Sequence, residues 1–171
     1  MNVSLTSPDK THELNVLKSL FWHITNNDLR ELKTLAWHEH IQFFKRNPHL
    51  KSPFIDSLVG ICLSQCIVFH QINSEQRIND LDIWHFYKEN KNMNFPYRVH
   101  KINEDGYKGR RIDFLKRAIP ERLFRYSLEN PGQIIINYLR EEESKTRISL
   151  IEKGIIGLWP ESIFGRRIGR D

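Results

Sequence analysis

The expected fold rests on two short segments, Asn79-Asp-Leu-Asp-Ile-Trp84 and Gly109-Arg-Arg-Ile-Asp-Phe-Leu115. Both segments alternate polar and apolar residues and contain strand-forming side chains, so we predict a β-strand in each. In a strand, residues i and i+2 point to the same side of the sheet. Asp80 and Asp82 are therefore expected to present two carboxylates ~7 Å apart, which is twice the rise per residue.

A third carboxylate is expected beside this pair. Asp113 lies between two apolar residues, so an adjacent strand would bring it onto the face of Asp80 and Asp82. Isolated Asp-x-Asp pairs are common and mostly hold no metal, but three clustered acids repel one another unless a cation lies among them. Hard oxygen ligands suit Mg²⁺ or Mn²⁺. We predict that Asp80, Asp82 and Asp113 are catalytic residues and ligands of Mg²⁺ or Mn²⁺.

The positive charge of the chain is concentrated in one segment. The formal net charge is +5. Nine Lys and Arg residues and four acidic residues lie between residues 98 and 125, whereas the remainder of the chain carries 17 of each sign. Such an excess beside Asp113 suits a site that handles phosphate, although a solvated basic surface gives the same count. We predict that Lys108, Arg110 and Arg111 contact the phosphates of a substrate.

Length and composition exclude several classes of protein. The chain has 171 residues, of which 39% are hydrophobic and 27% are charged, so it is neither disordered nor of low complexity. No apolar run approaches the roughly 18 residues of a membrane span. The N-terminal residues lack the basic and apolar regions of a secretory signal, and two cysteines cannot build a disulfide framework. We expect a soluble, cytoplasmic protein.

The sequence before the first acidic segment predicts mainly helices. Residues 8–24 and 28–46 carry apolar side chains at helical spacing, and the second stretch starts with the capping-box pattern Asp28-Leu-Arg-Glu31. Residues 52–72 fit a helix at their start and become rich in strand formers at 66–69. Periodicity does not settle where the helix gives way to the strand.

The sequence after the first acidic segment predicts a turn, the second strand and then further helices. The turn is expected at Asp105-Gly106, and the helices over 121–129, 133–143 and 144–158, the last capped by Ser144. We therefore expect an α+β fold in one domain, 1–171, whose small mixed sheet is flanked by helices. Its parts are a helical region 1–50, a catalytic core 51–118 and C-terminal helices 119–171.

The two acidic segments resemble the [DE]-h-[DE]-h…h-[DE]-h signature of the nucleotidyltransferase superfamily, which has the polymerase-beta-like fold. More closely, residues of about 58–118 resemble a little-characterised bacterial group related to that superfamily. The matching stretches are Gly60-Ile-Cys-Leu-Ser-Gln-Cys-Ile-Val-Phe-His70, Asn79-Asp-Leu-Asp-Ile-Trp-His-Phe-Tyr87 and Tyr107-Lys-Gly-Arg-Arg-Ile-Asp-Phe-Leu-Lys-Arg117.

The resemblance implies an enzyme that moves a nucleoside monophosphate from an NTP to an acceptor hydroxyl. In this reading Asp80 and Asp82 bind the metal, and Asp113 helps to activate the acceptor. Members of the superfamily carry Gly-Ser or Gly-Gly where a helix N-terminus holds the nucleotide phosphates. This chain has Ser64-Gln65 at that place, so Ser64 can donate to a phosphate but no glycine eases close backbone approach.

The sequence leaves the acceptor and two other functions open. RNA, a protein hydroxyl and a small molecule all remain possible acceptors, and the basic segment favours RNA. The chain can also be a non-catalytic nucleotide- or RNA-binding protein of the same fold, which the missing glycine supports. A metal-dependent nuclease uses similar acidic clusters and is the third alternative.

Two weaker patterns accompany these. Cys62, Cys66 and His70 would share one face of a helix, although three ligands on one helix suit tetrahedral zinc poorly. Aromatic residues alternate with basic ones in the region 84–111, where they can stack on bases or pack against the sheet. These residues are Tyr87, Phe95, Tyr97 and Tyr107.

Overall fold

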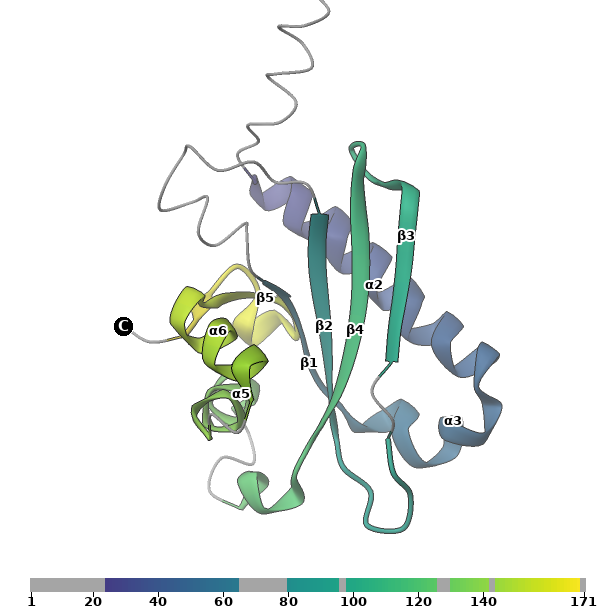
Figure 1. Cartoon of the computed structure of the whole chain (residues 1–171), viewed down its shortest axis with the longest axis vertical. Coiled ribbons are helices and arrows are strands. Elements are labelled where there is room, and N and C mark those ends of the chain that lie inside the picture. The colour runs from purple at the N-terminus through teal and green to yellow at the C-terminus, as the bar shows by residue number, and fades with distance from the viewer. Residues whose placement is uncertain (1–23, 65–79, 96–97, 126–129, 142–143, 170–171) are drawn as a thin grey trace, which may run out of the picture.

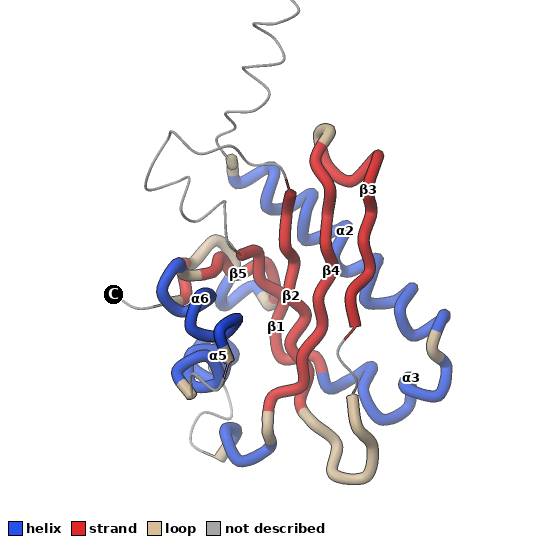
Figure 2. The backbone as a smooth tube through the Cα atoms, viewed as in Figure 1, coloured by secondary structure: helices blue, strands red, loops and turns tan. Residues whose placement is uncertain are grey.

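A six-stranded mixed sheet lies at the centre of the molecule, with helices on both of its faces (Figure 1 and Figure 2). This arrangement, seen in a computed structural model, confirms the α+β class. The structure describes residues 24–64, 80–95, 98–125, 130–141 and 144–169. Within these ranges, no helix is long and apolar enough to cross a membrane.

The sheet has the strand order β3-β4-β2-β1-β5-β6. Strands β2 and β4 pair parallel, and the other neighbouring strands pair antiparallel. The strands are β1 (Leu58–Ser64), β2 (Asp80–Lys88), β3 (Arg98–Tyr107), β4 (Arg110–Ile119), β5 (Ile155–Trp159) and β6 (Arg167–Ile168). The two strands expected from the acidic segments are therefore confirmed as β2 and β4.

Helix α2 (Asn26–Arg46) covers one face of the sheet, and α3 (Pro48–Phe54) follows it. Helices α5 (Pro131–Arg140) and α6 (Lys145–Lys153) pack against part of the other face, where their apolar residues meet β1, β2 and β5. Alternate residues of each strand serve the two faces. Ile83 and Phe114 pack under α2, whereas Trp84 and Phe86 face the α5 side.

Two local expectations are wrong, each for a physical reason. Helix α2 is capped by Thr25, whose side chain accepts from the Asp28 backbone N–H, so Asp28 is the third residue of the helix and not its cap. The turn between β3 and β4 is formed by Lys108 and Gly109, whose φ angles are +48° and +74°. Gly106 lies within β3, where a Cβ would approach the Arg110 carbonyl oxygen to 2.2 Å.

The C-terminal part is less helical than expected. The predicted helix over 144–158 does begin at its Ser144 cap, but it ends at Lys153 because Gly154 follows with a φ of +78°. Residues 155–159 then form β5, which pairs with β1. The predicted helix over 121–129 is a short 3-10 turn, Glu121–Phe124, in its described portion. The predicted helix over 8–24 and the strand-like segment 66–69 lie outside the described residues, apart from Ile24.

A group of buried charges holds α2 on the sheet. Lys116 of β4 is fully buried, and its Nζ lies 2.8 Å from Glu39 Oε1 on α2. Arg46 Nη2 donates to both carboxylate oxygens of Glu39 at 2.8 and 2.9 Å. Phe43 completes the surroundings, with its ring centroid 4.6 Å from the lysine nitrogen. The buried lysine thus has its charge compensated only while α2 stays docked.

Two buried histidines lie beside this group. His40 Nδ1 is 2.9 Å from the Tyr87 hydroxyl, and His85 Nε2 is 2.9 Å from the Ala36 carbonyl oxygen. Burial, assisted by the charge of Lys116, lowers the pKa of His40 to about 4 and the pKa of His85 to about 3. Both rings are therefore neutral in the folded protein at pH 7.

We expect Glu39→Gln to lower the free energy of unfolding by about 3–5 kcal/mol, because it leaves Lys116 buried without a compensating carboxylate. Urea denaturation at pH 7 measures this. The control is Glu161→Gln, which removes the exposed partner of Lys33 and should leave the stability at the wild-type value. Equal stabilities of the two variants would contradict the role assigned to Glu39.

We also expect the stability to fall between pH 7 and pH 5. The unfolded chain has histidine pKa values near 6.5, so below that pH it binds more protons than the folded chain, whose histidines titrate only near 4 and 3. The loss should be about 2 kcal/mol for each histidine at pH 5. Urea denaturation across this range tests it. The variant His40→Asn should show a shallower dependence, and an unchanged slope would argue against this assignment.

Candidate functional site

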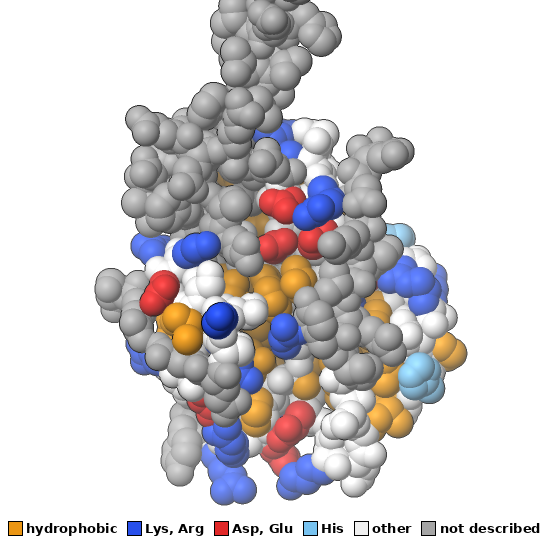
Figure 3. Space-filling view, in the orientation of Figure 1, with side chains coloured by type: hydrophobic (Ala, Val, Ile, Leu, Met, Phe, Trp, Pro, Cys, Tyr) orange, Lys and Arg blue, Asp and Glu red, His pale blue; other side chains and the backbone are white. Residues whose placement is uncertain are grey.

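Five polar residues meet on one face of the sheet where β1 ends and β2 and β4 begin. The β-pairing aligns Ser64 with Asp82 and Asp82 with Asp113, so these three form one row across three neighbouring strands. Asp80 and Arg111 form the next row of the same face. This is the face away from α2, and Figure 3 shows acidic and basic side chains gathered over the upper part of the sheet there.

Arg111 lies between two of the three aspartates. Its Nη2 donates to Asp80 Oδ2 at 2.7 Å, and its Nε lies 3.1 Å from Asp113 Oδ1. The second contact is an ion pair without hydrogen-bond geometry, so the buried Oδ1 of Asp113 has no hydrogen-bond partner. The Asp80 and Arg111 side chains are 36% and 38% exposed, against 12% for Asp113. The cluster is thus open to solvent on the Asp80 side and closed beneath Asp113.

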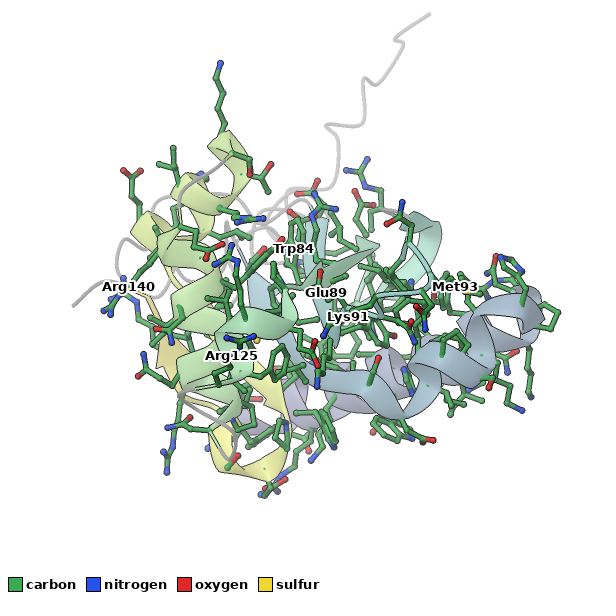
Figure 4. All side chains as sticks on the ribbon, turned by 90° about the horizontal axis from the view of Figure 1, so that it is seen from below. Trp84, Glu89, Lys91, Met93, Arg125 and Arg140 are labelled. Atoms are coloured by element: carbon green, nitrogen blue, oxygen red, sulfur yellow. The ribbon has the colours of Figure 1, made fainter. Side chains whose placement is uncertain are left out.

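Ser64 is held in place by Trp84. The indole Nε1 donates a hydrogen bond of 2.7 Å to Ser64 Oγ, and both side chains are buried. Because the hydroxyl oxygen accepts this bond, the hydroxyl proton stays available for donation to another group. Trp84 lies on the side of the sheet away from α2, as Figure 4 shows from below. This contact is not among the sequence-based expectations, although Trp84 follows Asp82 by two residues and therefore shares its face.

The predicted phosphate-binding residues divide between the two faces. Arg111 belongs to the acidic cluster, whereas Lys108 and Arg110 lie on the α2 side. Lys108 Nζ contacts Asp28 Oδ1 at 2.6 Å, and Tyr107 donates to the same oxygen at 2.8 Å. Arg110 is buried and donates to the Lys108 carbonyl oxygen. The structure therefore places only Arg111 beside the three aspartates, so the phosphate contacts predicted for Lys108 and Arg110 would have to form elsewhere.

Asp28 organises this second group of charges at the start of α2. Its burial opposes ionisation, but contacts with Lys108, Thr25 and Tyr107 outweigh that effect and hold the pKa of the Asp28 carboxyl well below its usual range. The charge of Asp28 is therefore fixed at neutral pH, and it ties the β3–β4 turn to the helix N-terminus.

The aromatic and cysteine patterns have structural roles in the described residues. Tyr87 is fully buried, Phe95 packs against it with ring centroids 4.8 Å apart, and Tyr107 is 7% exposed. Cys62 lies in a strand, not a helix, and burial raises its pKa. The expectation of a shared helical face with Cys66 and His70 is therefore wrong for Cys62, and Cys66, His70 and Tyr97 lie outside the described residues.

The aspartates suit a hard cation by their chemistry, but Arg111 stands among them. Across the described ranges, no group of three or more His, Cys, Asp or Glu side chains is arranged to hold a metal ion. The carboxylate oxygens of Asp80, Asp82 and Asp113 are nevertheless the ligand type that Mg²⁺ and Mn²⁺ prefer. The buried Oδ1 of Asp113 makes no hydrogen bond and has the Arg111 Nε as its cationic neighbour at 3.1 Å. The three carboxylates thus have the chemistry of a divalent-cation site, but in this structure the Arg111 guanidinium lies between Asp80 and Asp113.

Comparison with protein families, with curated proteins and with solved structures finds no match for this chain.

We expect Lys108→Ala to act on stability and not on phosphate binding. Lys108 is half-exposed and contacts Asp28, which keeps its bonds to Tyr107 and Thr25, so the loss should be about 1 kcal/mol in the free energy of unfolding. Affinity for a nucleoside triphosphate, measured by calorimetry, should stay within twofold of wild type. A tenfold weaker affinity would contradict this expectation and would indicate that Lys108 contacts phosphate.

Proposed function

We propose that this protein is a metal-dependent nucleotidyltransferase that transfers a nucleoside monophosphate from an NTP to an acceptor hydroxyl. The observation that carries the proposal is the row of Ser64, Asp82 and Asp113 across three neighbouring strands, with Asp80 beside it on the same face. This row joins residues from three separate stretches, and all three resemble nucleotidyltransferase sequences.

In the proposed reaction Asp80, Asp82 and Asp113 hold Mg²⁺ or Mn²⁺. When bound, the metal activates the attacking oxygen and neutralises charge on the leaving pyrophosphate. Asp113, the third carboxylate of the cluster, accepts the proton of the acceptor hydroxyl. The acceptor oxygen forms a bond to the α-phosphorus as the bond to pyrophosphate breaks.

Ser64 and Arg111 bind the triphosphate in this scheme. Ser64 donates its hydroxyl proton to a phosphate oxygen, because Trp84 already occupies its oxygen as an acceptor. Arg111 offers the planar, bidentate donor pair that suits phosphate. The acceptor is RNA, a protein or a small molecule, and the basic segment 98–125 favours RNA.

The contacts of Arg111 also favour a second candidate function. Because its guanidinium bridges Asp80 and Asp113, the same site can bind nucleotide or RNA without catalysis, with Arg111 as a permanent counter-ion. The two candidates differ in whether a divalent metal binds at the aspartates and whether an NTP is consumed.

The test is transfer of label from each α-labelled NTP, with Mg²⁺ or Mn²⁺, into a cell extract that contains RNA, proteins and metabolites. We expect Asp82→Asn to lower the transfer by about 10²-fold or more, because it removes a metal ligand. Its stability should be unchanged or slightly higher, since the change relieves repulsion with Asp113. Asp56→Asn, at an exposed aspartate outside the site, is the matched control.

Other outcomes point to the alternatives. Label transfer by Asp82→Asn at the wild-type rate would contradict the proposal, and unfolding of that variant would make the aspartate structural. Phosphodiester cleavage without NTP consumption would favour a nuclease. Nucleotide binding without transfer or metal binding would favour the non-catalytic protein.

A further inference from the structure

We infer that Arg111 is an internal counter-cation that closes the aspartate cluster until a metal-bound triphosphate displaces it. The inference rests on the proposed function and deepens it, because it describes how the same site is regulated. Its basis is the position of the Arg111 guanidinium, which contacts Asp80 and Asp113 at 2.7 and 3.1 Å.

The sheet register places Arg111 at a corner of the cluster. Arg111 is the cross-strand neighbour of Asp80 and precedes Asp113 by two residues on the same strand, so all three share one face. Asp82 occupies the remaining corner, beside Asp113. A cation that binds the carboxylates must therefore compete with a positive charge that the chain itself supplies.

This competition ends only when the Arg111 side chain moves away from the aspartates. A guanidinium stays protonated at any physiological pH, so a change of pH cannot release the carboxylates from it. The Arg111 side chain is 38% exposed and can swing outward without opening the core. Asp113 is mostly buried and stays in place, so the arginine is the partner that moves.

The released guanidinium then has a new partner beside it. Arg111 projects from the face on which the row of Ser64, Asp82 and Asp113 would hold a metal-bound triphosphate, and its planar fork matches phosphate oxygens. A metal ion bound alone would be coordinated by the carboxylates but would leave the Arg111 guanidinium next to a second cation. A metal ion bound together with triphosphate would give the carboxylates a cation and give Arg111 a phosphate partner. The site is therefore expected to bind the metal with triphosphate more favourably than the metal alone.

The test measures Mn²⁺ binding by electron paramagnetic resonance, first alone and then with tripolyphosphate as the probe. Wild type is compared with Arg111→Ala, which removes the competing charge. We expect Arg111→Ala to bind Mn²⁺ alone about three- to tenfold more tightly and to bind tripolyphosphate with Mn²⁺ about tenfold more weakly. Arg111→Lys keeps one charge without the fork and should fall between the two proteins in both measurements.

The matched control is Arg125→Ala. Arg125 belongs to the same basic segment and is exposed. It follows the C-terminal end of β4, whereas the aspartates lie at the start of β2 and β4, so its loss lowers the net charge equally without touching the aspartates. We expect it to change either affinity by less than twofold. An equal gain in Mn²⁺ affinity in both variants would make the effect one of general charge and would overturn the inference.

The remaining outcomes separate the inference from the proposed function. If wild type binds Mn²⁺, Asp82→Asn does not, and Arg111→Ala binds it no more tightly, the counter-cation role fails while the metal site stands. If neither wild type nor Arg111→Ala binds Mn²⁺ with or without tripolyphosphate, both proposals fail. Thermal denaturation of each variant is run beside the titrations, and Arg111→Lys carries the test if Arg111→Ala does not fold.

Discussion

The parallel pairing of β2 with β4 is the constraint on which the site depends. It sets Asp82 beside Asp113 and Asp80 beside Arg111. Side chains alternate between the faces of a strand, so a slip of one residue would turn Asp113 under α2 and move Lys116 to the opposite face. Asp80 and Asp82 lie on β2 and Asp113 lies on β4, so this register is what brings the three carboxylates together on one face.

The register is held from the face opposite the site. Lys116 lies three residues after Asp113 on β4, and it is fully buried where Glu39 of α2 receives it. A buried ammonium without its carboxylate is costly, so shifted registers that separate Lys116 from Glu39 are strongly disfavoured. Apolar residues of β4 add to this, because Ile112 and Phe114 fill the core beneath the same helix. Packing on the α2 face of the sheet therefore positions the polar residues on the opposite face.

The sequence predicts more of this fold where a local pattern determines the structure than where a distant contact does. Alternation predicts β2 and β4, and the Ser144 cap of α6 is confirmed. The helix predicted over 144–158 is wrong for residues 155–158, because their strand partner, β1, lies far away in sequence. Side-chain alternation places Arg110 and Arg111 on opposite faces of β4, but a count of charges along the sequence does not distinguish them. The contact of Lys108 with Asp28 spans 80 residues, and no local pattern reveals it.

The two groups of charges differ in a way that bears on function. Under α2, Asp28 meets Lys108 and Glu39 meets Lys116, so each buried carboxylate has a cation supplied by the chain. In the cluster on the other face, Arg111 contacts Asp80 and Asp113, and Asp82 lies beside Asp113, in a chain that carries a net charge of +5. A basic protein that keeps a concentration of carboxylates at the end of its central strands creates a place where a cation is favoured. An anionic ligand is attracted to the surrounding charge and can reach the carboxylates only through such a cation. This combination is the physical reason for proposing a metal-bound phosphate compound, and not a free cation, as the ligand of the site.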